Sequence, residues 1–392
     1  MTEERGPRHE FCQRTSPELA ADPWGHWDVL RADYDHFLSL EDHADPTWTF
    51  TRHDPIYDAL RDYELFSSIA VETCTPVGAH RWIPEEMDPP EHTAYRQIIV
   101  SSFSPRAADD WAGRIRDRCC ELIDSFVGDG EVEVYGQFAR QYPTRIFMEM
   151  MGLPVDRADE LLSWADDLLA EGIGGEARRT AGLNIYGMLI ETFEARKAEP
   201  RDDLMTLLVQ GEVDGRRLTD PELAEYGMLL YMGGLDTVAS ILSCMFRHFA
   251  EHPEDRRAVI GDPNLVDSAV EEILRAYAVI NTGRVVTRDA DFHGCPVRAG
   301  DRVLLSTSAA NRDPDVFPDP TTIDIRRSPN RHLAFGAGPH RCLGSHLARL
   351  ELAIALEEWH RRIPDYHVVD PDRIVTKGGS VVGIKRLELA WD

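Results

Sequence analysis

The segment from residue 332 to residue 344 reads His-Leu-Ala-Phe-Gly-Ala-Gly-Pro-His-Arg-Cys-Leu-Gly. Its two glycines, Gly336 and Gly338, allow a tight bend of the backbone just before Cys342. A helical pattern follows over residues 343–362, and the positive end of its dipole would point at the sulfur. Because such a position lowers the pKa of a thiol, the segment predicts a thiolate at Cys342 that binds a metal or acts as a nucleophile.

Three other interpretations compete with a metal-binding thiolate. A cysteine taken alone is most often a small buried hydrophobic residue. A dinucleotide-binding loop needs a third glycine where this chain has Arg341. A zinc site would have four candidate ligands here, His332, His340, Cys342 and His346. That set lacks a Cys-x-x-Cys pair and a His-x-x-x-His pair, so its spacing argues against zinc.

The whole pattern, Phe-Gly-x-Gly-x-His-x-Cys-x-Gly from Phe335 to Gly344, resembles the haem-binding loop of the cytochrome P450 family at every fixed position. The resemblance implies that Cys342 is the axial ligand of haem b and that Phe335 packs near its sulfur. It also implies that His340 reaches a haem propionate and that Gly344 belongs to the cofactor-binding loop. A thiolate ligand pushes electron density onto iron and favours O–O cleavage, which is the chemistry of a monooxygenase.

Further motifs resembling that family occur in the expected order. Glu272 and Arg275 are spaced as in the family's ExxR helix, and opposite charges three residues apart share one helix face. Residues 310–314 and 324–327 resemble the meander that follows, in which Arg327 would complete a structural Glu–Arg network. An isolated ExxR sequence usually marks a solvated surface pair, so the order of the motifs carries the assignment.

The pair Gly233–Gly234 precedes Asp236 and Thr237 in a long apolar stretch. Adjacent glycines weaken a helix, and a threonine can hydrogen-bond back to a carbonyl or outward to a ligand. Taken alone, the pair is better explained by close packing of helices. Joined to Cys342, it resembles the oxygen-binding kink of the family, which implies that Thr237 orients dioxygen and that Asp236 relays protons.

Basic residues in two other segments resemble the family's propionate ligands. His92 and Arg96 are four residues apart and would face one propionate together, while Arg284 would contact the other. Surface pairs are the ordinary alternative. A buried carboxylate nevertheless needs cationic partners, which gives the convergence a physical cause.

The resemblance also implies an apolar substrate pocket. Its lining residues would be His80, Trp82, Leu229, Met232, Gly233, Ile280, Val381 and Val382. Such walls suit a compact terpenoid rather than a charged substrate, although the same residues equally suit plain core packing. Residues 142–148 and 389–392 resemble the soluble bacterial, camphor-hydroxylating members, but His80 stands where those use a tyrosine. That difference argues against camphor itself and leaves His80 as a donor to substrate oxygen or an exposed loop histidine.

Most of the longer periodic stretches are helical, and short strand patterns occur at residues 48–51 and 302–305. The longest predicted helix begins at Thr219-Asp220-Pro221, where Asp220 can cap it and Pro221 suits the first helical position, and it stops before Pro253. Its apolar centre is long enough to span a membrane. A carboxylate at the centre of a lipid-exposed helix is expensive, so Asp236 predicts a helix buried in protein, facing a functional cavity.

No repeat or linker divides the sequence, which predicts a single domain over residues 1–392, mainly α with minor β. We expect residues 1–20 to be a loosely ordered extension. The family resemblance implies a triangular helical prism that holds haem between the long central helix and the helix after Cys342.

The chain carries 69 acidic and 42 basic side chains, a formal charge of −27, which repels phosphate backbones and anionic lipid surfaces. Its seven cysteines are odd in number and form no Cys-x-x-Cys pair, which indicates a reducing compartment. The N-terminus is charged and lacks an apolar core. We therefore expect a cytoplasmic monomer without nucleic-acid or membrane partners.

Together these features predict a haem monooxygenase that inserts one oxygen atom into an unactivated C–H bond of a small apolar cyclic substrate, such as a monoterpenoid. The chain shows no flavin or iron–sulfur module, so its electrons should come from a separate partner. The family resemblance implies that this partner is a 2Fe–2S ferredoxin served by a ferredoxin reductase. A haem peroxygenase and a non-catalytic haem sensor or carrier are the alternatives. The pair Asp236 and Thr237 argues against the peroxygenase, because these groups serve dioxygen activation.

Overall fold

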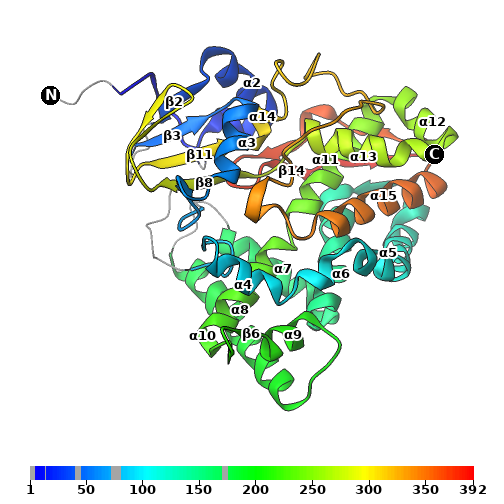
Figure 1. Cartoon of the computed structure of the whole chain (residues 1–392). Coiled ribbons are helices and arrows are strands. Elements are labelled where there is room, and N and C mark those ends of the chain that lie inside the picture. The colour runs from blue at the N-terminus through cyan, green and yellow to red at the C-terminus, as the bar shows by residue number, and fades with distance from the viewer. Residues whose placement is uncertain (1–4, 14, 40–45, 72–80, 170–174) are drawn as a thin grey trace.

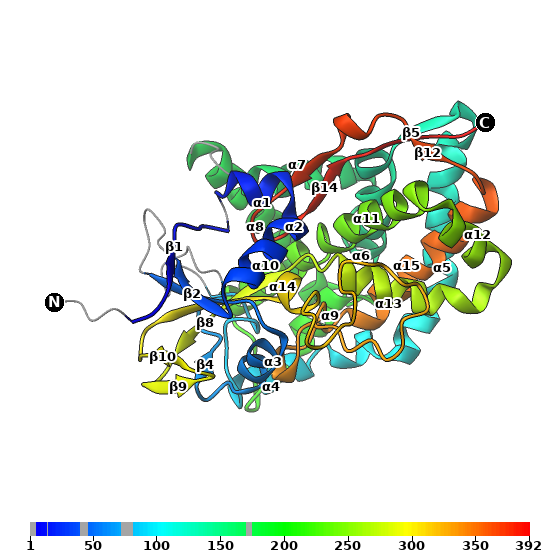
Figure 2. The ribbon, with the colours of Figure 1, turned by 90° about the horizontal axis from the view of Figure 1, so that it is seen from above.

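The computed structural model describes residues 5–13, 15–39, 46–71, 81–169 and 175–392, so that His80 lies outside the described residues. Helices fill most of a roughly triangular outline, and a small sheet occupies one corner of it (Figure 1). Seen from above, the sheet and the long helices form one continuous body (Figure 2). The prediction of a mainly helical fold with minor β structure is confirmed.

The main sheet joins segments from both ends of the chain. In the described residues its strand order is β1 (Arg8–His9), β2 (His36–Ser39), β3 (Thr47–Phe50), β11 (Arg302–Ser306), β8 (Asn281–Val286) and β4 (Phe66–Ser67). The two strands that the sequence predicts, β3 and β11, pair in parallel, with Arg302 opposite Thr47 and Leu305 opposite Phe50. β8 runs antiparallel to β11, which fixes Arg284 in a central strand.

The large helices enclose the main core. They are α5 (Pro105–Phe126), α6 (Gln141–Met151), α7 (Ala158–Leu169), α8 (Gly175–Ala198), α10 (Asp220–Gly233), α11 (Thr237–Glu251), α13 (Val266–Ala276) and α15 (Ser345–Arg362). α15 packs against α5, α13 and α11. Its fully buried Trp359 lies against Phe246 of α11, with 4.2 Å between the ring centroids. This packing fixes the helix after Cys342 relative to the central helices.

Shorter elements complete the fold. The remaining α-helices are α1 (Pro17–Ala21), α2 (Pro23–Asp33), α3 (His53–Arg61), α4 (Glu91–Gln97), α9 (Leu204–Gln210), α12 (Pro253–Gly261) and α14 (Thr307–Ala310). The remaining strands are β5 (Glu131–Glu133), β6 (Glu212–Val213), β7 (Arg216–Arg217), β9 (Ala290–Phe292), β10 (Cys295–Val297), β12 (His367–Val368), β13 (Val375–Lys377), β14 (Gly383–Arg386) and β15 (Glu388–Ala390).

The central helix differs from its prediction at two points. Its N-cap is Thr219 rather than Asp220, because Thr219 and Glu222 form a reciprocal capping box. The helix is also broken: α10 ends at Gly233, and α11 begins at Thr237. Over residues 220–251 the stretch is apolar enough to cross a membrane, yet 56% of its most apolar window is buried inside the protein.

The break has a steric component at Gly234. A Cβ atom on this residue would lie 2.2 Å from Cδ1 of Phe147 in α6, so only glycine lets the two segments approach this closely. Gly233, by contrast, has no atom within 4 Å of its hypothetical Cβ. Close packing against Phe147 therefore explains the glycine at position 234 but not the one at position 233.

We predict that Gly234→Ala lowers the stability of the apoprotein by about 1–3 kcal/mol, because the added methyl group overpacks the contact with Phe147. Gly233→Ala is the matched control and should not destabilise the apoprotein, since its methyl group meets open space. Chemical denaturation midpoints of the two variants measure this difference. Equal midpoints would contradict the steric explanation.

The N-terminal segment is more ordered than the sequence suggested. Within residues 5–13 and 15–21, β1 pairs in parallel with β2, and α1 is capped by Ser16. Phe11 and Leu19 are both buried in the main core. The expected loose extension was wrong for these residues, because two apolar side chains anchor them to the rest of the fold.

Candidate functional site

The loop before α15 is shaped by its two glycines. Gly336 and Gly338 have φ angles of +65° and +69°, in the left-handed region that favours glycine. At Gly338 a Cβ atom would lie 2.5 Å from the carbonyl oxygen of Leu60. The bend closes with a hydrogen bond of 2.8 Å from the Cys342 N–H to the Phe335 carbonyl. The sulfur-bearing residue therefore lies two residues before Gly344, the N-cap of α15.

In the chain without haem, the pKa of the Cys342 thiol lies above its ordinary value. Although Cys342 is an exposed residue, desolvation of its sulfur raises its pKa, against the opposing hydrogen bond from the Gly344 N–H and the nearby Arg96 and Arg341 charges. The helix terminus thus acts in the predicted direction but is not the dominant effect. Thiol deprotonation is generally coupled to metal binding, because the metal supplies the positive charge.

Residues of α13 and α15 contact the cysteine loop and hold it in place. The Arg349 guanidinium lies 4.5 Å from the centre of the Phe335 ring. Arg349 is itself held by Glu271, with 2.5 Å from Nε to Oε1, and His332 lies 3.1 Å from the other oxygen of that carboxylate. The two partners lower the pKa of Glu271 to about 2, even though burial opposes them. Sequence analysis did not identify Glu271 and Arg349, because α13 and α15 meet only in the folded chain.

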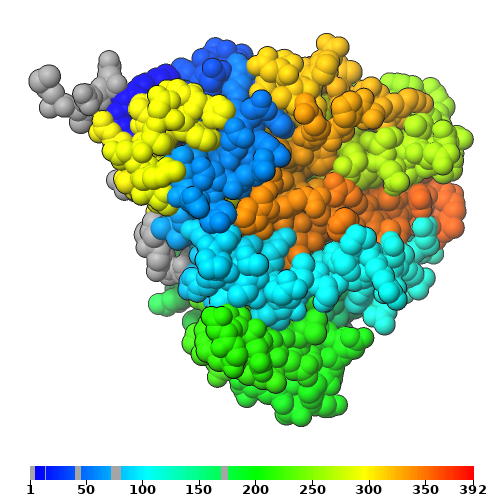
Figure 3. Space-filling view, in the orientation of Figure 1, coloured from blue at the N-terminus to red at the C-terminus, as the bar shows by residue number. Residues whose placement is uncertain are grey.

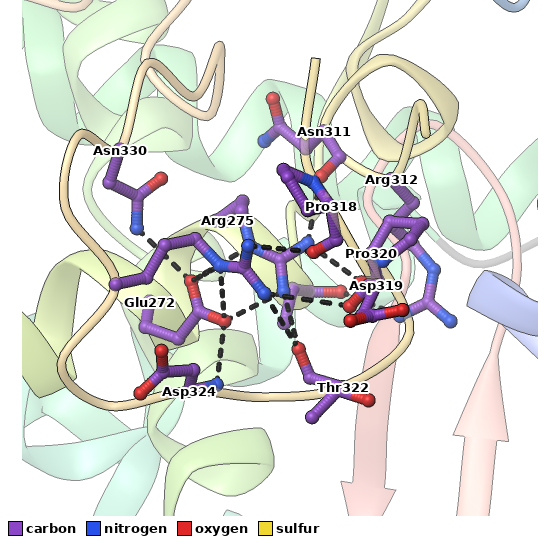
Figure 4. Close-up of polar contacts among 12 residues, drawn as sticks. Glu272, Arg275, Asn311, Arg312, Pro318, Asp319, Pro320, Thr322, Asp324 and Asn330 are labelled. Atoms are coloured by element: carbon purple, nitrogen blue, oxygen red, sulfur yellow. Dashed lines mark hydrogen bonds and ion pairs between the residues drawn. The ribbon is translucent and has the colours of Figure 1, made fainter. Parts of the chain in front are cut away.

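The fully buried Glu272 is the centre of a polar network (Figure 4). Arg275 donates two hydrogen bonds of 2.8 Å to its carboxylate, and Arg327 approaches both oxygens at 3.1 Å. The Asp324 N–H and the Asn330 amide complete the set. Arg275 also donates to the carbonyls of Asn311, Pro320 and Thr322.

This network fixes the segment that leads into the cysteine loop. Asn311, whose carbonyl is held by Arg275, accepts a hydrogen bond of 2.6 Å from the Leu333 N–H through its side chain. The structure thus brings Glu272, Arg275 and Arg327 together and connects them to the residues just before Phe335. The many hydrogen bonds to the Glu272 carboxylate and the Arg275 guanidinium favour one backbone arrangement of this segment.

Four basic residues gather at the loop, and we call them the basic cluster: His92, Arg96, Arg284 and His340. The rings of His92 and His340 lie 4.1 Å apart. Burial, reinforced by neighbouring cations, lowers the pKa of His92 to about 4 and that of His340 to about 2. Burial also lowers the pKa of Arg284 to about 10.

The basic cluster has incomplete polar partners, although the Glu85 and Asp88 carboxylates partly oppose the effect of burial on the pKa of Arg284. Among the described residues, no carboxylate forms an ion pair with Arg284, which donates only to Thr282 Oγ1 and the Gly283 carbonyl. The buried atoms His92 Nδ1 and His340 Nε2 have no hydrogen-bond partner there either. Buried cations and donors without partners are costly. The two propionates of haem b would supply the missing acceptors, so the residues present fit this cofactor.

The break between α10 and α11 presents Thr237 and Asp236. The Thr237 hydroxyl lies 3.4 Å from the Gly233 carbonyl. Asp236 carries the predicted carboxylate, and both of its oxygens have partners: Tyr135 donates to Oδ1 at 3.2 Å, and Lys377 forms an ion pair with Oδ2. Neither Tyr135 nor Lys377 was identified from the sequence, because no local pattern connects them to residue 236.

The predicted pocket residues lie in several elements. Trp82, Met232, Ile280, Val381 and Val382 belong to or pack against one apolar cluster. Ile280 forms an isolated bridge with Val381, and the Val382 N–H donates to the Val279 carbonyl at 2.9 Å. Leu229 is half-buried in α10, and Gly233 is exposed. The structure thus brings Ile280, Val381 and Val382 together, while the role of all eight residues stays a prediction.

Comparisons with known proteins agree with this architecture. The family model for cytochrome P450 matches residues 184–362. The probable cytochrome P450 127A1 of Sinorhizobium fredii is 37% identical over 348 residues, which cover 88% of this chain and 83% of that protein. The steroid C26-monooxygenase of Mycolicibacterium smegmatis is 36% identical and covers 82% of this chain and 81% of its own length. The crystal structure of CYP101J2 superposes with a TM-score of 0.88 at 32% identity, covering 98% and 97% of the two chains.

A mainly helical fold, a cysteine loop just before a helix and a cluster of basic side chains together fit a haem-binding protein. The chain belongs to the cytochrome P450 family, whose members are haem b monooxygenases. Among the described residues no three His, Cys, Asp or Glu side chains could hold a bare metal ion. The zinc interpretation of the cysteine loop therefore finds no support.

Proposed function

We propose that this chain hydroxylates an unactivated C–H bond of a small apolar cyclic compound, with Cys342 as the thiolate ligand of haem b. The observation that carries the proposal is the placement of Cys342 beside the basic cluster, in which Arg284 forms no ion pair with a described residue and His92 Nδ1 and His340 Nε2 have no hydrogen-bond partner there. Haem with a thiolate ligand supplies dioxygen activation. The overall reaction consumes dioxygen, two electrons and two protons, puts one oxygen atom into the product and releases the other as water.

The residues of the chain have separate tasks in this reaction. Arg96, Arg284, His92 and His340 hold the propionates. Thr237 donates a hydrogen bond toward dioxygen, and Asp236 passes protons inward from solvent. Val381, Val382 and Ile280 exclude water and orient the apolar substrate. The steroid-oxidising relative supports an apolar substrate, and the monoterpenoid class remains the prediction from the pocket residues.

Electrons come from a 2Fe–2S ferredoxin in this proposal. The cysteine loop and α15 reach the surface in the centre of Figure 3, between the segments of α4 and α13. Arg341, the neighbour of Cys342, is exposed on this loop. A positive side chain next to the haem ligand suits an acidic partner although the whole chain is negative. We also propose that the protein is a cytoplasmic monomer.

The test uses purified holoenzyme with camphor and cholesterol as probes. A compound that displaces water from the iron should shift the haem absorption, and it should then be hydroxylated with ferredoxin, reductase and dioxygen. Hydroxylation with hydrogen peroxide but not with reduced ferredoxin would indicate a peroxygenase instead. Absence of NAD(P)H consumption with every compound of a wider panel of sterols and cyclic monoterpenoids would contradict the proposal.

We predict that Thr237→Ala lowers product formation by about tenfold or more and diverts the electrons to hydrogen peroxide, because the hydroxyl that guides proton transfer is lost. Thr237→Ser is the control, since it keeps the hydroxyl and should keep most of the coupling. The ratio of peroxide to product per NAD(P)H consumed measures the effect. An unchanged ratio in the alanine variant would count against the role of Thr237.

A further inference from the structure

The carboxylate of Asp236 is held from outside its own helix. Lys377 of β13 forms an ion pair with one oxygen, and Tyr135, in the π-helical turn Tyr135–Ala139, donates to the other. The side chains of Asp236 and Lys377 are only 16% and 19% exposed. An ion pair shielded to this degree is screened less by salt than a surface pair.

The other charged groups near this contact are already engaged. Arg140 and Asp166 both influence Tyr135, and they form an ion pair with each other at 2.7 Å. Burial raises the pKa of Tyr135, and the Asp236 charge adds to the rise, so Tyr135 acts as a neutral donor. Lys377 is therefore the cation that pairs with Asp236.

Lys377 belongs to a hairpin that also carries predicted pocket residues. In the β13–β14 pair, Lys377 lies opposite Gly383. A Cβ atom on Gly383 would lie 2.7 Å from the side chain of Ser240, so the hairpin backbone packs directly on α11. β14 and α11 are neighbours in Figure 2. The turn between the two strands contains Val381 and Val382, which contact the chain at Val279 and Ile280.

We propose that Lys377 is a positioning residue that fixes the Asp236 carboxylate at the break between α10 and α11. Through Lys377, the β13–β14 hairpin, which carries the predicted pocket residues Val381 and Val382, also fixes the position of the proton-supplying Asp236 carboxylate. This inference rests on the proposed function, because it gives Lys377 a task only where Asp236 passes protons to the reaction. Lys377 itself touches neither substrate nor cofactor in this account.

The first test is backbone hydrogen exchange of the substrate-free holoenzyme. Lys377→Met should speed exchange of the Ser240 amide, which donates to the Asp236 carbonyl at 3.0 Å, by about tenfold, because the start of α11 loses its anchor. Lys377→Arg keeps the charge and should stay near wild type. Lys385→Met is the matched control, since Lys385 is exposed on the same hairpin and forms no ion pair with a described residue. Unchanged exchange in Lys377→Met would overturn the proposal.

The second test separates a positioning role from a merely structural one. With camphor or cholesterol, whichever is turned over, Lys377→Met should raise the ratio of peroxide to product severalfold, and Lys377→Arg should restore it. The Asp236→Asn, Lys377→Met double variant should be no more uncoupled than Asp236→Asn alone, because Lys377 acts through Asp236. Additive effects would overturn the proposal. Hydrogen exchange needs no substrate, so it decides the role of Lys377 even if the proposed hydroxylation fails.

Discussion

Cys342→His should bind haem and yet form no hydroxylated product from dioxygen. The basic cluster would still hold the propionates, so the haem content should remain a large fraction of that of the wild type. A neutral imidazole does not supply the electron density that a thiolate gives to iron, so O–O cleavage loses its driving force. Haem content measures the retained cofactor binding, and product formation with reduced ferredoxin measures the loss of hydroxylation.

Cys120→Ser is the control for the loss of a thiol. Cys120 lies in α5, where its sulfur contacts Glu358 at 3.4 Å, far along the chain from the cysteine loop. Its activity should stay within about twofold of wild type, as for substitutions away from the core and the site. A Cys342→His variant with product formation like that of the control would refute the ligand assignment.

Glu272→Ala should cost about 3–5 kcal/mol of stability, because it leaves the Arg275 charge buried and removes one of the anchors of Arg327. Both Glu272 and Arg275 are 0% exposed, so water cannot replace the lost carboxylate. The meander would lose its connection to α13, and the loop before Cys342 would be freed with it. Denaturation of the apoprotein gives the stability, and haem binding reports the state of the loop.

Glu160→Ala provides a matched comparison. Glu160 also pairs with an arginine three residues away, Arg157, at 2.6 Å, but the two side chains are 47% and 42% exposed. Removing it should leave the denaturation midpoint unchanged, because an exposed pair contributes little. Similar losses in both variants would show that burial is not what makes the Glu272 network important.

Short motifs with fixed spacing predicted the position of the cysteine loop before α15 and of the Glu272–Arg275 pair on α13, while the roles of these residues stay predictions. The glycines of the cysteine loop and the ExxR pair depend on local geometry, so sequence alone placed them in the right elements. The strands at residues 48–51 and 302–305 were also predicted, although their parallel pairing was not. The family resemblance predicted a kink at Gly233–Gly234, but not that the helix would end at Gly233 and start again at Thr237. The contact of Gly234 with Phe147 comes from a distant helix, so the sequence around Gly234 does not indicate it.

Local sequence patterns could not predict contacts and pKa shifts that depend on segments far apart in the chain. The pKa of Cys342 follows the desolvation of its surroundings more than the helix terminus next to it. Lys377 reaches Asp236 across 141 positions of sequence, and nothing in either segment indicates the contact. Tyr135 is also far from its partner in the sequence, because it donates to Asp236, just before α11.

The ligation of haem by Cys342 is tested most directly by the carbon monoxide difference spectrum of the reduced wild-type holoprotein. The account predicts the strongly red-shifted Soret band that a thiolate opposite carbon monoxide produces. A Soret band of the imidazole-ligated type, or no haem spectrum at all after reconstitution, would contradict it.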